Sequence, residues 1–240
     1  MKNILARGGV EFLAVLLGIT ASLWIDKNQK ESEIELDRIN VHQIIEKEIS
    51  EIIQFTDKRL DYYNKQNDNI VFLFENYETF NTDKIEDAGQ LIYDIFTTGT
   101  YMYNPNFSTF GALKNDGRFN LIDNELRKKL SELTMLMDYI KKIESNENKA
   151  RGVLLNYIST NHPEIHHKYP HSGWLQSEGK AENFLRILEN TRSDKTVWSL
   201  LSRKCRLTRS RNNRVKWAKD MLTSIQEKLM TINSNNNVLQ

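Results

Sequence analysis

Residues 215–232 read VKWAKDMLTSIQEKLMTI, and their apolar side chains recur at every third or fourth position. This spacing places them along one face of an α-helix, as a stripe that other helices must cover. The stripe consists of Val215, Ala218, Leu222, Ile225, Leu229 and Ile232. Only 10 Gly and 3 Pro interrupt the 240 residues, so we expect long helices and an all-α fold.

The same stripe continues upstream through Lys204, Thr208 and Arg211, within a segment, residues 203–219, that carries eight Lys or Arg. Such a density is also typical of surfaces that bind nucleic acid or anionic lipid. However, the formal net charge is only +1, and residues 31–51 hold seven acidic residues against two basic ones. We therefore predict that the first and last long helices lie side by side with complementary charge, and that no nucleic acid binds.

Breaks in the apolar pattern set the expected bounds of the other helices. Asp123 or Asn124 is a suitable N-cap for one helix, and Ser193 or Asp194 for the last. Residues 97–111, which contain Gly and Pro, are predicted to form a loop. The predicted helices cover residues of about 28–66, 68–80, 85–98, 124–160 and 194–233.

The most apolar stretch of the chain is RGGVEFLAVLLGITASLWIDK, residues 7–27. Phe12 to Ile25 are 14 uncharged residues, and a helix that starts at Gly8 is about 27 Å long, near the hydrocarbon thickness of a bilayer. The end of this stretch, TASLWIDK, makes a poor signal-peptidase site. We expect a retained transmembrane helix; a signal peptide and a buried helix of a soluble protein are the alternatives.

Glu11 is the only charge inside this stretch, and it shares a helix face with Ala14, Gly18 and Ser22. Small residues at this spacing allow transmembrane helices to approach closely, so we expect a second copy of the chain to pack on this face. Two alternatives stay open. In one, Glu11 only pairs with Arg7 one turn away; in the other, Glu11 residues from several copies line an ion path.

The predicted organisation is an N-terminal tail (1–7), a transmembrane helix (8–26), a helical domain (27–233) and a disordered polar tail (234–240). The transmembrane helix is expected to continue into an elongated antiparallel helical bundle. Positive charges flank it on both sides, but those after it are interleaved with acids. The positive-inside rule therefore favours an N-terminus in the cytoplasm and the bulk of the chain outside.

Four histidines lie within ten residues of each other in a loop that also contains two prolines. Imidazole is a common ligand of transition metals, so His162, His166, His167 and His171 are candidate metal ligands. Their spacing matches no defined site, and a solvated loop with no bound metal is the alternative.

Sequence motifs of common enzyme classes are missing. The chain contains no P-loop, no dinucleotide-binding glycine motif, no H-E-x-x-H and no G-x-S-x-G. Cys205, the single cysteine, lies on a predicted helix without an obvious His or acidic partner, so we expect it to be buried and inert. We predict no catalytic activity and no cofactor.

Residues 110–130, FGALKNDGRFNLIDNELRKKL, predict a helix, a turn at 115–117 and a second helix. Basic and amide side chains surround this turn, and either bind a partner or satisfy helix-end carbonyls. They are Lys114, Arg118, Asn120 and Arg127.

This segment and the apolar stretch together resemble a family of uncharacterised bacterial single-span membrane proteins that is grouped as a domain of unknown function. The matching residues are Glu11, Gly18, Leu113, Lys114, Gly117, Arg118, Asn120, Ile122, Leu126 and Arg127. The resemblance implies a single-pass protein of the bacterial inner membrane, with its bulk in the periplasm, and implies no activity.

Two functions follow as expectations. The first is a membrane-anchored, self-associating helical interaction or sensory module whose partners are the lipid bilayer, further copies of the chain and an unidentified protein. The second is a small homo-oligomeric ion or proton channel, lined near its entrance by Glu11.

Overall fold

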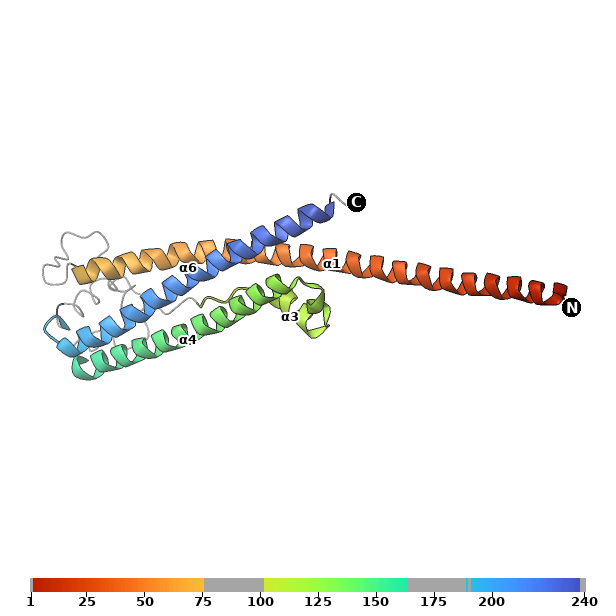
Figure 1. Ribbon diagram of the computed structural model, residues 1–240. Coiled ribbons are helices and arrows are strands. Elements are labelled where there is room, and N and C mark those ends of the chain that lie inside the picture. Colours follow the sequence, from red (N-terminus) through yellow and green to blue (C-terminus); the bar gives the residue numbers. More distant parts are fainter. Residues whose placement is uncertain (1, 76–101, 164–188, 190, 238–240) are drawn as a thin grey trace. The chain divides into compact units, whose positions relative to one another are not determined.

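The computed structural model describes residues 2–75, 102–163, 189 and 191–237, except for the side chains of residues 2–11, 13, 14, 75 and 235–237. Its elements are α1 (Lys2–Glu75), α3 (Ser108–Asn115), the 3₁₀-helix η2 (Arg118–Leu121), α4 (Asn124–Asn161) and α6 (Lys195–Asn237) (Figure 1). These ranges contain no strand, so the predicted all-α class is confirmed for them. Within the same ranges, none of the helices is both long and apolar enough to cross a membrane.

The predicted start of each of the two later helices is confirmed, and in both cases an aspartate supplies the cap. Asp123 Oδ1 accepts hydrogen bonds from the backbone N–H groups of Glu125 and Leu126, at 3.0 and 3.2 Å, and so caps α4. Asp194 Oδ1 does the same for Thr196 and Val197 at the start of α6, at 2.8 and 3.3 Å.

The predicted end of the first helix, near residue 66, is wrong. Helix α1 continues to Glu75. The polar residues at 67–69 do not interrupt it because the buried face continues past them through Gln66, Ile70 and Leu73, which are at most 5% exposed. The rest of the two short helices predicted at 68–80 and 85–98 lies outside the described residues. The predicted loop at 97–111 ends early, since α3 begins at Ser108.

The chain forms two compact units. Unit 1 comprises residues 1–49, 107–127 and 226–240, and unit 2 comprises residues 50–106 and 128–225. Each of the three long helices therefore contributes one segment to each unit. The boundary predicted at residue 26 is a different division, and it stays a prediction.

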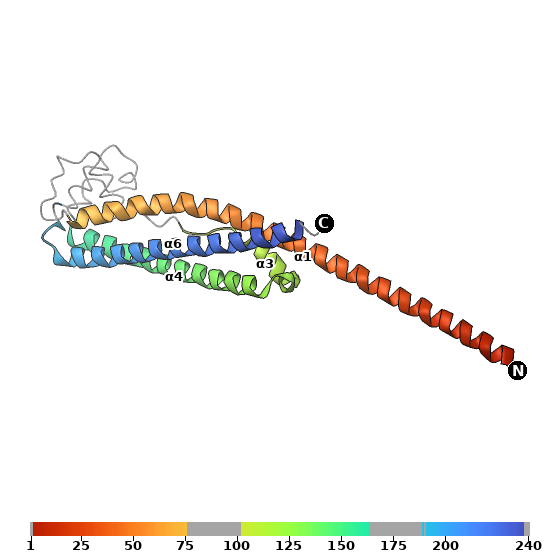
Figure 2. The same cartoon turned by 45° about the horizontal axis from the view of Figure 1, so that its top comes forward.

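In unit 2, the segments of α1, α4 and α6 lie side by side (Figures 1 and 2). Helix α6 runs antiparallel to α1: Lys219 pairs with Asp57 at 2.5 Å, and Trp198 packs edge-on against Phe74 with ring centroids 5.8 Å apart. The apolar stripe of α6 faces this core, and its members from Val215 to Ile225 have no exposed surface.

This antiparallel register also determines which acids meet the basic segment of α6. The side-by-side arrangement of the first and last helices is confirmed within unit 2. Within unit 2, Lys219 of α6 pairs with Asp57 of α1, and Arg211 of α6 pairs with Glu147 of α4. Neither acid belongs to the predicted acidic segment, residues 31–51. The prediction matched charge totals along the chain but did not take the register into account.

In unit 1, a side chain of α1 caps the short helix α3. Phe107, at the N-cap position of α3, cannot supply a side-chain hydrogen bond. Instead the Glu48 carboxylate accepts hydrogen bonds from the backbone N–H groups of Thr109 and Phe110, at 2.8 and 3.0 Å. Gly117 then reverses the chain with a φ of 82°, a conformation that favours glycine. A negative charge at a helix N-terminus is stabilising, so Glu48 fixes α3 against α1.

Candidate functional site

The core of unit 2 contains a set of fully buried polar side chains, which we name the Arg211 cluster. Its members come from all three long helices: Tyr63, Gln66, Glu147, Thr208, Arg211 and Asn212. The sequence already placed Thr208 and Arg211 on the stripe of α6. Their partners on α1 and α4 had no distinguishing pattern in the sequence.

Arg211 is the centre of this cluster. Its Nη1 donates to Glu147 Oε2 at 2.8 Å, and its Nη2 donates to Gln66 Oε1 at 2.6 Å. Its guanidinium carbon also lies 4.0 Å from the centroid of the Tyr63 ring, within the range of a cation–π interaction. A single side chain of α6 therefore binds residues of both neighbouring helices.

Most of the remaining polar groups are satisfied by hydrogen bonds as well. The second oxygen of Glu147 accepts a hydrogen bond from the Thr208 hydroxyl at 2.6 Å, and Asn212 donates to the backbone carbonyl of Tyr63 at 2.7 Å. Because the buried acid is bonded at both oxygens, its attraction to Arg211 offsets much of the desolvation cost of the pair. Only Nε of Arg211 lacks a partner among the described residues.

A second buried acid, Glu144, lies on the same helix three residues earlier. Its Oε1 accepts a hydrogen bond from the backbone N–H of Tyr103 at 2.7 Å, whereas Oε2 has no partner in the described part of the chain. Burial raises the pKa of Glu144 above its usual range, which favours the neutral acid. The Tyr103 hydroxyl lies 2.7 Å from that of Thr56, and burial raises the pKa of Tyr103 to about 12.

Lys204 and Cys205 extend the polar region toward the start of α6. Lys204 has no exposed surface, and burial lowers the pKa of its ammonium group. Cys205 is 6% exposed, and burial raises the pKa of its thiol to about 12. The thiol therefore stays protonated at neutral pH, as expected of a buried and inert cysteine.

The geometry of the Arg211 cluster fits a structural role and not a binding site. Glu147 and Arg211 are at most 1% exposed, so a substrate has no access to the charged pair. Their hydrogen bonds depend on one relative position of the three helices. The cluster therefore fixes the register of the three helices.

The predicted transmembrane packing residues are only partly described. Gly18 and Ser22 are exposed on α1, and a Cβ atom at Gly18 would meet no atom within 4 Å. The side chains of Glu11 and Ala14 lie outside the described residues. The structure therefore places no other element against this face within the described residues.

The residues around the 115–117 turn bind one another through their side chains. Arg118 Nε donates to Asp116 Oδ2 at 2.8 Å, and Arg127 donates to the side-chain oxygens of Asn120, at 3.3 Å, and Asn124. Arg127 and Asn120 thus come together, but these bonds join side chains to one another and do not reach the helix-end carbonyls that the second interpretation required. Lys114 is exposed.

The histidine segment is described at only one of its four candidate ligands. His162 Nε2 lies 2.9 Å from Asp194 Oδ2, on the residue that caps α6. His166, His167 and His171 lie outside the described residues. In the ranges that the structure does cover, no three metal-ligating side chains come together.

His42, in unit 1, is a buried residue that the sequence analysis did not select. It is 1% exposed, and neither ring nitrogen has a hydrogen-bond partner among the described residues. Burial, reinforced by the nearby positive charge of Arg38, lowers the pKa of His42. The sequence did contain one indication that His42 is buried: it directly follows Val41, which lies on the apolar face of α1.

Comparison of the chain with protein-family models, with curated proteins and with solved structures found no match. The resemblance to the single-span bacterial family therefore stays a prediction from two segments of sequence.

Replacement of Arg211 by Met tests the buried cluster. The change leaves Glu147 and Gln66 buried without their donor, so we expect the free energy of unfolding to fall by about 3–5 kcal/mol. Replacing both partners, Arg211→Met with Glu147→Leu, should restore most of this loss. Urea unfolding measures both effects, with Arg203→Met at an exposed position of α6 as the control. Equal losses in the single and double variants would contradict the assignment.

The pKa of His42 predicts that unit 1 loses stability in acid. Because folding lowers this pKa, the unfolded chain binds more protons as the pH falls below about 6.5, with a maximum slope of about 1.4 kcal/mol per pH unit. We expect amide exchange in residues 36–49 to accelerate between pH 7.5 and pH 5.5, after correction for intrinsic rates. His42→Leu should remove this acceleration, and an unchanged pH dependence in that variant would exclude His42 as its source.

Proposed function

We propose that the chain is a membrane-anchored, self-associating helical interaction module without catalytic activity. It crosses the bacterial inner membrane once, near its N-terminus, and the bulk of the chain lies in the periplasm. The observation that carries this proposal is the concentration of exposed apolar side chains near the start of α1.

Eight large apolar residues between 12 and 25 are each 46–67% exposed. Successive residues of a helix are rotated by roughly 100°, so these side chains point to all sides of α1. A helix that is apolar all round requires a protein core or lipid around it. The residues are Phe12, Val15, Leu16, Leu17, Ile19, Leu23, Trp24 and Ile25.

A bilayer is the environment that best fits this surface. The polar hydroxyl of Thr20 is already satisfied within the helix, since it donates to the backbone carbonyl of Leu16 at 2.9 Å. Trp24, at the end of the stretch, is a residue that favours the membrane interface. The proposed membrane segment is residues 8–26 of the sequence, and the side chains of residues 8–11, 13 and 14 lie outside the described ones.

Self-association is proposed through the face that carries Gly18 and Ser22. The open space around Gly18 leaves room for the backbone of a second helix, which only small residues allow at close range. Glu11 belongs to the same face by its position in the sequence. Its carboxylate is proposed to pair at the membrane interface and to take no part in ion conduction.

The absence of catalysis is proposed from the location of the reactive groups. The buried acids, Lys204 and Cys205 are held in the core of unit 2 at exposures of at most 6%. Their arrangement supports a scaffold that presents its surface to a protein partner. The exposed Lys114 beside the turn of unit 1 is a candidate contact for that partner.

A pair of reporter fusions tests the membrane topology. Alkaline phosphatase fused after Gln240 should be active, because the proposed orientation places it in the periplasm, where its disulfides form. Green fluorescent protein fused after Gln240 should not fluoresce, because it does not fold correctly when the general secretory pathway exports it. The opposite pattern, an inactive phosphatase fusion and a fluorescent green fluorescent protein fusion, would refute the proposed orientation.

Two matched substitutions test self-association. Gly18→Leu fills the proposed contact face and should lower the oligomeric state measured by native mass spectrometry in detergent. Leu16→Ala, on the opposite face, should leave the oligomeric state unchanged. Both positions are exposed on α1, so neither substitution disturbs packing among the described residues. Glu11→Gln should preserve the assembly and give no change in liposome conductance. An intact oligomer in Gly18→Leu would contradict the packing face, and a Glu11-dependent current would favour the channel.

A further inference from the structure

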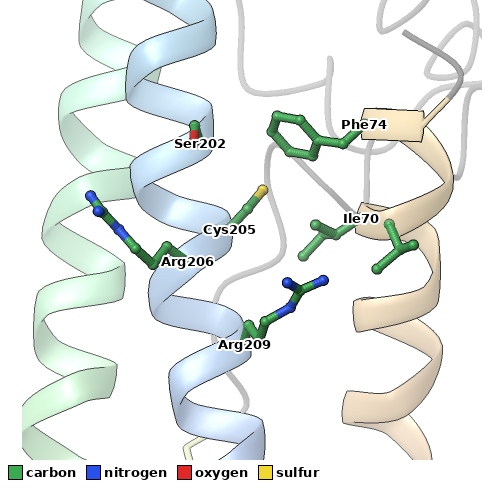
Figure 3. A pocket seen from close by; sticks show the side chains of 7 residues that line it. Ile70, Phe74, Ser202, Cys205, Arg206 and Arg209 are labelled. Carbon is green, nitrogen blue, oxygen red and sulfur yellow. The ribbon is translucent and has the colours of Figure 1, made fainter.

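Unit 2 has a pocket of about 370 Å³ between the last turns of α1 and the first half of α6 (Figure 3). Its α1 wall consists of Ile70, Val71 and Phe74, and residues between 202 and 209 form the α6 wall. Sites for small organic ligands typically have volumes of about 300–1,000 Å³, so the pocket is large enough for one small molecule.

The inner part of the pocket is apolar. Ile70 is 5% exposed, whereas the Phe74 ring is 37% exposed and points toward α6 (Figure 3). The edge-to-face contact between Phe74 and Trp198 holds this ring in position. The Cys205 sulfur points into the same space, and as a neutral thiol it acts as a small apolar group. This surface suits an alkyl chain.

One end of the pocket is positively charged. Arg209 extends from α6 toward α1 below Ile70, whereas Arg206 points away from α1 (Figure 3). Arg209 forms no ion pair with any carboxylate that the structure describes. By contrast Arg211, which donates to Gln66 of α1, is paired with Glu147. Arg209 is therefore available to an anion, and its planar guanidinium can bind both oxygens of a carboxylate.

We propose that this pocket binds a single-chain anionic amphiphile of the fatty-acid type, with its carboxylate on Arg209 and its alkyl chain along Ile70, Phe74 and Cys205. A cation would be repelled by Arg209, and an uncharged alkane would gain no charge-assisted bond from the guanidinium. The inference does not depend on the proposed membrane topology or on self-association.

Photo-crosslinking of the full chain with a decanoic acid that carries a diazirine at its terminal carbon tests this site. After irradiation of the purified chain, peptide mass spectrometry should find crosslinks on Ile70, Val71 or Phe74 and on the pocket-lining residues of α6. Excess decanoate should suppress them, and decanol at the same concentration should not. Mapping the crosslinked residues separates binding in the pocket from adsorption of the probe elsewhere on the chain.

Arg209→Gln should lower the crosslink yield at these residues about tenfold, as expected for the loss of a charge-assisted bond. Arg203→Gln, an exposed arginine of α6 that does not line the pocket, should leave the yield unchanged. Circular dichroism checks that both variants are folded. The proposal is overturned by crosslinks confined to other residues, by equal competition from decanol, or by an unchanged yield in Arg209→Gln.

Discussion

The buried guanidinium of Arg211 is the constraint on which the architecture of unit 2 depends. A charge in a protein core is tolerated only when hydrogen bonds and an opposite charge surround it. Here these come from Glu147 of α4, from Gln66 of α1 and from the face of the Tyr63 ring. Sliding any of the three helices by one turn, about 5.4 Å, would separate these groups and leave a charge unpaired. The apolar stripe drives association of the helices, and the polar cluster selects one register.

The two units achieve order in different ways. In unit 2, long apolar helix faces pack together with polar groups buried between them. A wrong register there is unfavourable because it leaves buried charges unpaired. Unit 1 holds a short helix, α3, whose own sequence lacks a cap, and Glu48 of α1 supplies it. Lys228 of α6 pairs with Asp123 at 3.2 Å, so the aspartate that caps α4 also binds the last long helix. In unit 1, polar contacts at helix ends thus add to an apolar core that includes Val41, Ile45 and Leu126.

Sequence reasoning succeeded where the signal was local. The stripe from Val215 to Leu229 and the caps at Asp123 and Asp194 follow from residues within one or two helical turns. It failed where the cause lay elsewhere in the chain. The partners of Arg211 are 64 and 145 residues away, and the acid that caps α3 is 61 residues away. The end of α1 was misplaced because a run of Asn and Asp resembles a turn when its packing partners are unknown. For the candidate site, the stripe identified Lys204, Thr208 and Arg211 but not the acids that determine their chemistry.

The bond between His162 and Asp194 joins the last turn of α4 to the first turn of α6. Asp194 uses its other oxygen to cap α6, so one carboxylate both starts a helix and ties it to the preceding one. The 31 residues from 163 to 193 are therefore bracketed by a contact that does not involve them. The entropic cost of closing a loop rises by only about 0.6 kcal/mol with each doubling of its length. The contact between His162 and Asp194 therefore holds the two helix ends together almost independently of how many residues the sequence places between them.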